Sequence, residues 1–310
     1  MLNLIVFGLI AVAQSAPSKH HKKPKVKENK TVDPQTDFAR ELAVAKQWSQ
    51  TVTGPADVVA NWTNSGDNIC YWEGFYCETN PFTNEYVLAS IDFNSKHLEG
   101  APTVSNLVEN FPDVALFHAN SNNFTGDIPD MSQLKYMYEF DISNNNFSGP
   151  WPRNLLTVPA FTYLDMRYNN FNGPIPAESL ISFPNMTDYY LNNNQFSGNI
   201  PDTIVQTPVQ NLMLFNNQLT GWIPWGLGKN KNIQQLSFSN NQLTGPIPWG
   251  LGGMTSLIYL DLSNNKLWGM VPDDLCGAPN LKQADLSGNW LAPWLGPKCQ
   301  KMKNEGRLWV

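Results

Sequence analysis

Acidic and tyrosine side chains recur through the middle of the chain at intervals of about 24 residues, the spacing of a repeating structural unit. If successive units place equivalent residues side by side, these side chains share one surface. Clustered carboxylates attract cations, and tyrosine offers contact area at a low entropic cost. The spacing therefore predicts a surface that binds a positively charged partner. Its residues are Tyr138, Glu139, Asp141, Tyr163, Asp165, Tyr168, Asp188, Tyr190 and Phe215.

Two other interpretations of these residues compete with ligand binding. Asp is also a common solvated choice at strand positions, and Arg167 lies among the acids, where we expect it to neutralise Asp141 or Asp188. Asp141 and Asp165 would lie near the ~5 Å spacing of neighbouring strands, which suits a catalytic carboxylate pair. However, no nucleophile–base set, phosphate loop or metal-ligand spacing is present. We therefore expect a protein that is not an enzyme and has no cofactor and no metal site.

The unit that positions these residues is marked by a column of Asn. In seven of the units a Gly follows four residues after this Asn, and a Pro three residues after the Gly. Apolar residues point inward, as Phe161, Leu164 and Met166 do in one unit, and the residue between the last two points outward. The Asn amide can pair the backbone groups that a buried turn leaves open. The column is Asn122, Asn145, Asn169, Asn194, Asn217, Asn241, Asn265 and Asn289.

This pattern predicts an α/β leucine-rich-repeat solenoid of about nine 24-residue repeats over residues 88–291. Parallel β-strands would form its concave face, and the Gly–x–x–Pro segments would make irregular returns on the convex side. Such a stack needs a cap at each open end. We expect the caps at residues 33–87 and 292–310. The first would contain a helix over 33–49, with Phe38, Leu42, Ala45 and Trp48 on one face, helped by Trp62 and Trp72.

The chain begins with an apolar stretch typical of a secretory signal peptide, residues 1–16, and a Lys- and His-rich arm follows at 17–32. We expect the arm to be disordered, acting either as an adhesive for acidic polymers or as a solvated linker. The first 30 residues carry six Lys and one Glu, or +5, so the whole-chain charge of −6 leaves −11 on the remainder. An acidic body disfavours nucleic-acid binding. No later stretch reaches the ~20 apolar residues of a transmembrane segment.

Secretion would expose the four cysteines to disulfide formation and the Asn-x-Ser/Thr sites to glycosylation. An even number of Cys behind a signal peptide favours disulfides, and only the pairs Cys70–Cys77 and Cys276–Cys299 keep the partners local, one pair in each cap. The glycan acceptor sites of a secreted, extracellular or wall-located chain would be Asn29, Asn61, Asn123, Asn146 and Asn185.

A second candidate surface comes from the hexapeptide IPWGLG, which occurs at 223–228 and 247–252. It places Trp225 and Trp249 one repeat apart, beside each other on the convex side or flank, with Trp222 and Trp268 nearby. This Trp group suits stacking on sugars or docking of a protein. The alternative is that the rings pack the irregular convex segments.

The repeat form x-G-x-I-P resembles the plant-type extracellular class of leucine-rich repeats. The segment Cys70-Tyr-Trp-Glu-Gly-Phe-Tyr-Cys77 is similar to the plant cap pattern C-x-W-x-G-x-x-C. Segments such as VALFHANSNNFTG (114–126) and YLNNNQFSGNIP (190–201) resemble the repeat domain of leucine-rich repeat extensins over roughly residues 38–299. We expect this chain to lack the extensin Ser-Pro tail of that family.

The resemblance implies a secreted protein that binds small, cationic, Cys-rich peptides of the rapid-alkalinisation-factor type, in cell-wall signalling or integrity. We therefore expect a basic peptide or protein ligand on the acidic and aromatic concave face. One alternative is an inhibitor of a secreted wall hydrolase, like the polygalacturonase-inhibiting proteins of the same repeat class. The other is a structural or carbohydrate-binding wall protein that holds wall polysaccharide through the Lys-rich arm and the Trp group.

Overall fold

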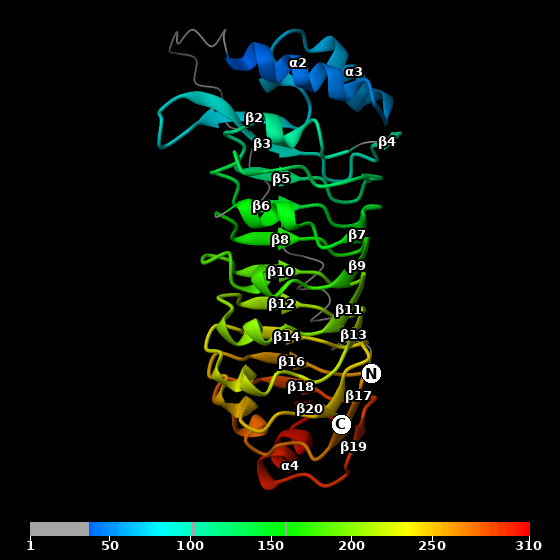
Figure 1. Ribbon diagram of the computed structural model, residues 1–310, viewed down its shortest axis with the longest axis vertical. Helices are drawn as coiled ribbons and strands as arrows, with labels where there is room; N and C mark the ends of the chain where they lie inside the picture. Colours follow the sequence, from blue (N-terminus) through cyan, green and yellow to red (C-terminus); the bar gives the residue numbers. More distant parts are fainter. Residues whose placement is uncertain (1–36, 101–102, 159) are drawn as a thin grey trace. The chain divides into compact units, whose positions relative to one another are not determined.

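The structure, a computed structural model, describes residues 37–100, 103–158 and 160–310. The predicted signal peptide, the Lys-rich arm and Asn29 lie outside these residues. In the described part, successive coils stack so that each adds a strand to one long sheet (Figure 1). Its strands, in order, are β2 (Phe75–Thr79), β3 (Tyr86–Asp92), β5 (Leu116–His118), β6 (Glu139–Asp141), β8 (Tyr163–Asp165), β10 (Asp188–Tyr190), β12 (Asn211–Met213), β14 (Gln235–Ser237), β16 (Tyr259–Asp261), β18 (Gln283–Asp285) and β20 (Leu308–Trp309).

The strand register confirms the predicted columns. All pairs from β3 to β20 are parallel, and Glu139 pairs with Tyr163, which pairs with Asp188. One position column therefore runs straight across the sheet. The apolar side chains of each coil point inward, and they form one continuous core along the stack. Neighbouring coils bury this core together because no single coil encloses one of its own.

The Asn ladder behaves as the sequence predicts. Asn217 Nδ2 donates to the carbonyls of Leu191, Leu214 and Phe215, and its Oδ1 accepts the backbone N–H of Phe196. The other ladder Asn residues make the equivalent bonds, so the turn after each strand has its buried backbone groups satisfied. The residue before each of the eight ladder Asn residues lies in the left-handed region. Asn or Ser fills that position in six coils, and Tyr168 and Gly288 fill it in the other two.

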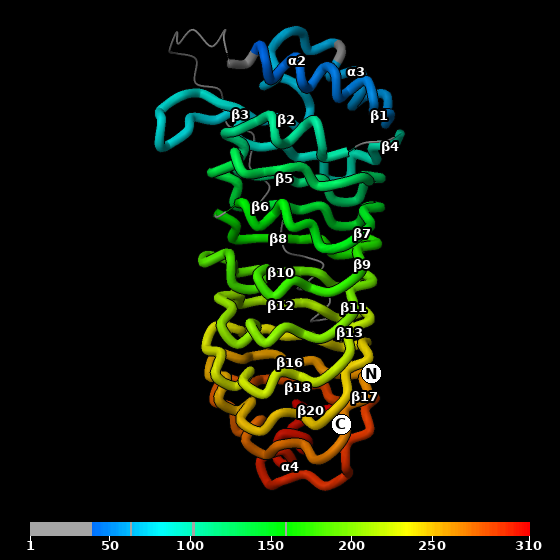
Figure 2. Tube along the Cα trace, viewed as in Figure 1, coloured from blue at the N-terminus to red at the C-terminus, as the bar shows by residue number. Residues whose placement is uncertain are grey.

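The prediction of irregular convex returns is wrong in one respect. The segments after the ladder residues from Asn145 to Asn289 form two further parallel sheets (Figure 2), whereas the segment after Asn122 makes an isolated bridge between Thr103 and Thr125. The side-chain oxygen of each ladder Asn accepts a backbone N–H from the preceding coil. This bond aligns the two backbones, so the peptide groups that follow it in the two coils face each other. Short 3₁₀ helices then follow in most coils, though the described residues between β5 and β6 contain none. The strands are β7 (Ser148–Pro150), β9 (Asn170–Pro174), β11 (Gln195–Asn199) and β13 (Gln218–Thr220), then β15 (Thr244–Pro246), β17 (Lys266–Gly269) and β19 (Trp290–Leu291). The 3₁₀ helices in the repeats are η2 (Val108–Asn110), η3 (Arg153–Thr157), η4 (Ala177–Leu180), η5 (Asp202–Gln206), η6 (Trp225–Lys229), η7 (Leu251–Gly253) and η8 (Leu275–Gly277).

The first coil is covered by helices α2 (Asp37–Ser49) and α3 (Ala56–Asn64), with η1 (Ile69–Tyr71) beside them. Between the two helices, β1 (Val52–Thr53) pairs antiparallel with β4 (Glu99–Gly100). Trp48 is buried and its ring stacks on Phe93 of the first coil, with a centroid separation of 5.3 Å. Burying this large ring closes the open end of the core.

The last coil is covered by α4 (Pro297–Asn304), and beyond that helix β20 extends the long sheet. Both predicted disulfides are present, Cys70–Cys77 in the first cap and Cys276–Cys299 in the last. Within the described ranges, no helix has the length and apolar character needed to cross a membrane.

Candidate ligand-binding face

The nine side chains predicted for the concave surface divide into two groups by exposure. All of them lie on β6, β8, β10 and β12 or beside these strands. Five remain partly exposed: Tyr138, Glu139, Tyr163, Tyr168 and Asp188. Four are buried: Asp141, Asp165, Tyr190 and Phe215. The contacts of the buried group explain why they do not reach solvent.

The buried aspartates are held by the backbone that follows them. One oxygen of Asp141 accepts the N–H of Ser143, and one of Asp165 accepts the N–H of Arg167. Asp92, Asp261 and Asp285, in the same column of other coils, make the same bond to the residue two positions on. This Asx-type turn explains why Asp recurs there. The column therefore has a structural role in the turn, which differs from the solvated Asp expected, because Asp141 and Asp165 are buried.

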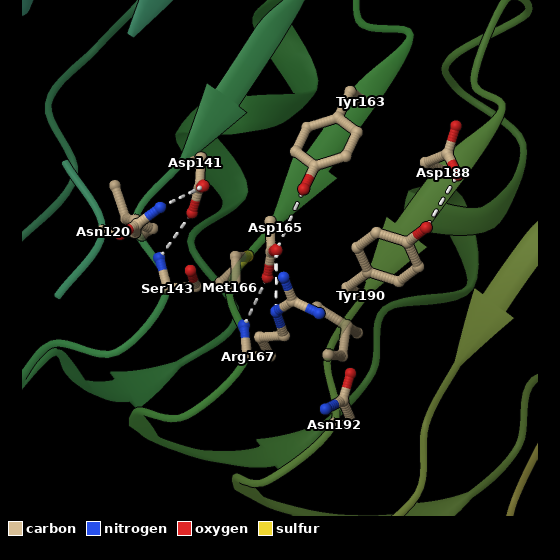
Figure 3. Close-up of polar contacts among 12 residues, drawn as sticks. Asn120, Asp141, Ser143, Tyr163, Asp165, Met166, Arg167, Asp188, Tyr190 and Asn192 are labelled. Carbon is tan, nitrogen blue, oxygen red and sulfur yellow. Dashed lines mark hydrogen bonds and ion pairs between the residues drawn. The ribbon is translucent and has the colours of Figure 1, made fainter. Parts of the chain in front are cut away.

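Asp165 lies at the centre of the most buried polar group on this face (Figure 3). It is fully buried, accepts a hydrogen bond from the Tyr163 hydroxyl, and its Oδ2 is 2.9 Å from Arg167 Nε. Burial, together with the charge of Asp141, raises the pKa of Asp165 well above its ordinary value, against the opposing effect of Arg167. The expectation that Arg167 neutralises Asp141 or Asp188 is wrong, because its charge accompanies Asp165 in the same coil.

Arg167 itself is confined. Its guanidinium lies over the Tyr190 ring, 5.3 Å from the centroid, in a cation–π arrangement. The contact of Nε with Asp165 is one of charge and not an aligned hydrogen bond, and neither Nε nor Nη1 has an aligned acceptor. The positive charge of the Arg167 guanidinium is therefore compensated by the Asp165 carboxylate and by the Tyr190 ring.

His118 adds a titratable group that the sequence prediction left out of the site. Its Nε2 lies 3.2 Å from Oε2 of Glu139. Burial alone lowers the pKa of His118, but the bond to Glu139 and the charges of Asp141 and Asp92 outweigh it, and the pKa is raised above its usual 6.5. The available signal was positional, since His118 occupies the same column as Asp141.

A small apolar cluster explains the burial of the aromatic members. Tyr190, Met213 and Phe215 pack together apart from the main core, and the Tyr163 ring meets Tyr190 edge-on at 5.7 Å. Burial, then the neighbouring carboxylates, raise the pKa of Tyr163 and of Tyr190. Both hydroxyls therefore stay protonated and donate to Asp165 and Asp188.

Three of the five partly exposed residues form a row of acid, tyrosine and acid on adjacent strands: Glu139, Tyr163 and Asp188. Asp188 is oriented by Tyr190, by Asn211 and by the hydroxyl of Thr187. Cross-strand neighbours are ~4.8 Å apart, so the backbones of the two acidic residues are about 10 Å apart with a tyrosine between them. Such a row can hold a cationic side chain.

The same contacts bear on catalysis and on metal binding. Asp141 and Asp165 are cross-strand partners, as predicted, but Asp165 is enclosed by Tyr163 and Arg167 and does not present a carboxylate to a substrate. Across the residues that the structure describes, no group of three or more His, Cys, Asp or Glu is placed to hold a metal ion.

The other predicted surface residues have clear environments. Trp225 and Trp249 are 49% and 61% exposed, and the covered part of Trp225 packs edge-to-face against Trp222. Among the described glycan acceptors, the side chain of Asn61 accepts the N–H of Glu73 from within α3. The remaining three, Asn123, Asn146 and Asn185, are exposed.

Known proteins contain repeats similar to those of this chain. The family model described as Leucine Rich Repeat matches residues 232–254 and 256–278. In Arabidopsis thaliana, leucine-rich repeat extensin-like protein 2 is 32% identical over 209 residues, which cover 65% of this chain and 26% of that protein. Leucine-rich repeat extensin-like protein 4 is 33% identical over 216 residues, covering 66% and 42%. The chain thus spans less than half of the length of either relative.

Two solved structures share the architecture. The leucine-rich-repeat ectodomain of the Arabidopsis receptor kinase HAESA, in complex with an extended IDA peptide hormone ligand, superposes with a TM-score of 0.73 at 25% identity, covering 88% of this chain and 44% of that one. The plant peptide hormone receptor RGFR1, in complex with RGF2, gives 0.57 at 31% identity, covering 59% and 30%.

The strand stack and the Asn ladder form a leucine-rich-repeat fold. Its homologues include leucine-rich repeat extensin-like proteins, at about 32% identity. The resemblance predicted from the repeat and cap motifs is therefore confirmed.

Proposed function

We propose that this chain is an extracellular binding protein that recognises a cationic peptide or protein on its concave face. The observation that carries the proposal is the row Glu139, Tyr163 and Asp188, in register on β6, β8 and β10. A Lys or Arg side chain placed over Tyr163 meets a carboxylate on each side and an aromatic face below.

The surroundings of the row support this use. Asp188 accepts three hydrogen bonds and Glu139 contacts His118, so both carboxylates are oriented before a ligand arrives. Preorganisation of this kind lowers the entropic cost of binding. The similar HAESA and RGFR1 structures contain peptide hormones, which makes a peptide the first ligand class to test. The extensin-like relatives support a role in the cell wall.

The test is a calorimetric titration of the full chain with a refolded cationic peptide of the rapid-alkalinisation-factor type. The double variant Glu139→Gln/Asp188→Asn should bind roughly five- to thirtyfold more weakly at low salt, since each exposed charge contact contributes ~0.5–1 kcal/mol. The difference should shrink in 0.5 M salt, about a 4–5 Å screening length. Asp141 and Asp165 are left intact because their burial would make their substitution a folding test.

A matched control removes the same charges elsewhere. Glu99→Gln/Asp127→Asn alters one Glu and one Asp that are exposed and lie off the long sheet. This variant should bind like the wild type. Equal affinities for both double variants at low salt would refute the proposal.

An inhibitor of a basic wall hydrolase is the second candidate, because the same acidic row suits a basic enzyme surface. An inhibition assay against a panel of secreted wall hydrolases separates the two. Inhibition that is lost in Glu139→Gln/Asp188→Asn, without binding of the peptide, would favour the inhibitor.

A further inference from the structure

The flank of the last coils exposes an unusual number of indole rings. Trp222, Trp268 and Trp290 are 54%, 48% and 66% exposed, although such residues are normally among the most buried. They lie on or beside β13, β17 and β19, along the edge of the stack away from β6–β18 (Figure 1). None of them belongs to the acidic face, so its function does not account for them.

These rings form a line across neighbouring strands. Pro246 pairs with Trp268, and Trp268 pairs with Trp290. Trp222 joins the line at Gly245, since a Cβ built on Gly245 would come within 3.0 Å of three atoms of the Trp222 ring. The Trp222 indole therefore packs against Gly245 and remains about half exposed. We call Trp222, Pro246, Trp268 and Trp290 the tryptophan band.

The band ends in a groove. Trp222 and Trp225 meet edge-to-face, 6.2 Å apart, and with Asn199 and Asp202 they line a depression of about 580 Å³. This volume lies within the ~300–1,000 Å³ range of small-ligand sites. The groove thus adds an amide and a carboxylate, both able to bond hydroxyl groups, beside two aromatic walls.

The other outward side chains near the band are mainly uncharged. Gln218, Thr220 and Thr244 supply amide and hydroxyl groups, and Lys266 and Asp202 give one charge of each sign. The flank is therefore close to neutral in a body that carries −11. This combination favours a neutral ligand that has apolar faces and hydroxyl-bearing edges.

We propose that the tryptophan band binds an uncharged, extended polysaccharide. The C–H face of a pyranose ring packs on an indole face, and its equatorial hydroxyls bond to flanking amides and hydroxyls. Successive strands displace the platforms in equal steps of ~4.8 Å, so the band offers a linear site to a linear polymer. Near-neutrality excludes polyuronates, which the acidic body also repels.

The experiment measures retention of the full chain on microcrystalline cellulose, with pectate beads as the anionic comparison. The wild type should be retained on cellulose. Retention of Trp222→Ala/Trp268→Ala should be at least about tenfold lower, because stacking on exposed rings supplies most of the affinity at such sites. Both rings are exposed, so the variant should keep its far-UV spectrum and its affinity for the cationic peptide.

Tyr71→Ala/Phe82→Ala is the matched control, since these rings are exposed in the first cap. It should bind cellulose like the wild type. The proposal is overturned if wild type and Trp222→Ala/Trp268→Ala are retained equally or not at all. It is also overturned if sedimentation shows a wild-type dimer that the Trp variant loses, since the band would then bind a second copy.

Discussion

Substituting Arg167 by Met tests the electrostatics at the centre of the concave face. The change removes the charge that accompanies the fully buried Asp165 while keeping most of the apolar stem of Arg. Breaking a buried ion pair at one partner costs ~3–5 kcal/mol of unfolding free energy, because the remaining charge is uncompensated. We expect a loss of that size at pH 7.5.

The loss should depend on pH in a defined direction. Burial and the charge of Asp141 already raise the pKa of Asp165, and Arg167 opposes them, so its removal raises the pKa further. A carboxyl whose folded pKa exceeds its unfolded value of ~3.9 costs nothing below that value, because it is protonated in both states. Between the two pKa values the fold loses up to ~1.4 kcal/mol per pH unit as the pH rises.

Urea unfolding followed by tryptophan fluorescence at pH 4 and pH 7.5 measures this effect. Arg153→Met is the matched control, since Arg153 pairs with Glu178 at the surface, and it should cost under ~1 kcal/mol at pH 7.5. The double variant Asp165→Asn/Arg167→Met should recover most of the loss. An equal loss for Arg167→Met at both pH values, or a loss no larger than that of Arg153→Met, would refute the reasoning.

Three further predictions concern the pH response, the ladder and the convex side. His118 has a raised pKa, so its protonation stabilises the fold below about pH 6.5, and this contribution is lost as the pH rises through the folded pKa. Affinity for a cationic peptide should therefore increase from pH 6 to pH 8 as the imidazolium beside Glu139 disappears, and calorimetry of His118→Gln should show a flat profile. Asn217→Ala leaves three carbonyls and one N–H without their partner and should lower the free energy of unfolding in urea by ~3–5 kcal/mol, against under ~0.5 for the exposed Gln218→Ala. Gly228→Ala places a Cβ against the carbonyl of Gly250 and should lower the thermal midpoint, with a cost of ~1–3 kcal/mol, whereas Gly→Ala at an unobstructed helical site stabilises.

Most of the fold was predictable because the repeat makes one coil determine the next. The Asn column has a single structural role, so its spacing fixed which residues point inward and which share a strand position. The pairing of Glu139, Tyr163 and Asp188 follows from that register alone. The caps were equally predictable from the sequence, because an open stack must bury the apolar surface at each of its ends.

The second set of sheets was less predictable for a physical reason. Its strands contain Gly and Pro, which have low strand propensity, as in Ser148–Pro150. Their extended pairing comes from the neighbouring coil, which is not visible in any local segment. A pattern of Gly and Pro therefore indicates a return of the chain without showing whether that return is hydrogen-bonded.

The state of the individual carboxylates was also beyond the sequence. Asp141 and Asp165 share the third strand position and are both buried, Asp165 beside Arg167, whereas Asp188 lies at the first strand position and reaches the surface. The difference depends on side-chain contacts between coils, such as that of Asn211 with Asp188. Charge at a strand position therefore predicts the face on which a carboxylate lies, but not its accessibility.

Carboxyl footprinting of the complex is the most direct test of the central claim, that a cationic ligand binds across β6, β8 and β10. The full chain would be labelled with a carbodiimide and an amine, with and without the cationic peptide, and the modified residues located by mass spectrometry. Glu139 and Asp188 should be labelled in the free protein and protected in the complex, while Glu99 and Asp127 are labelled equally in both. Protection of Glu99 or Asp127 with unchanged labelling of Glu139 and Asp188 would contradict the account.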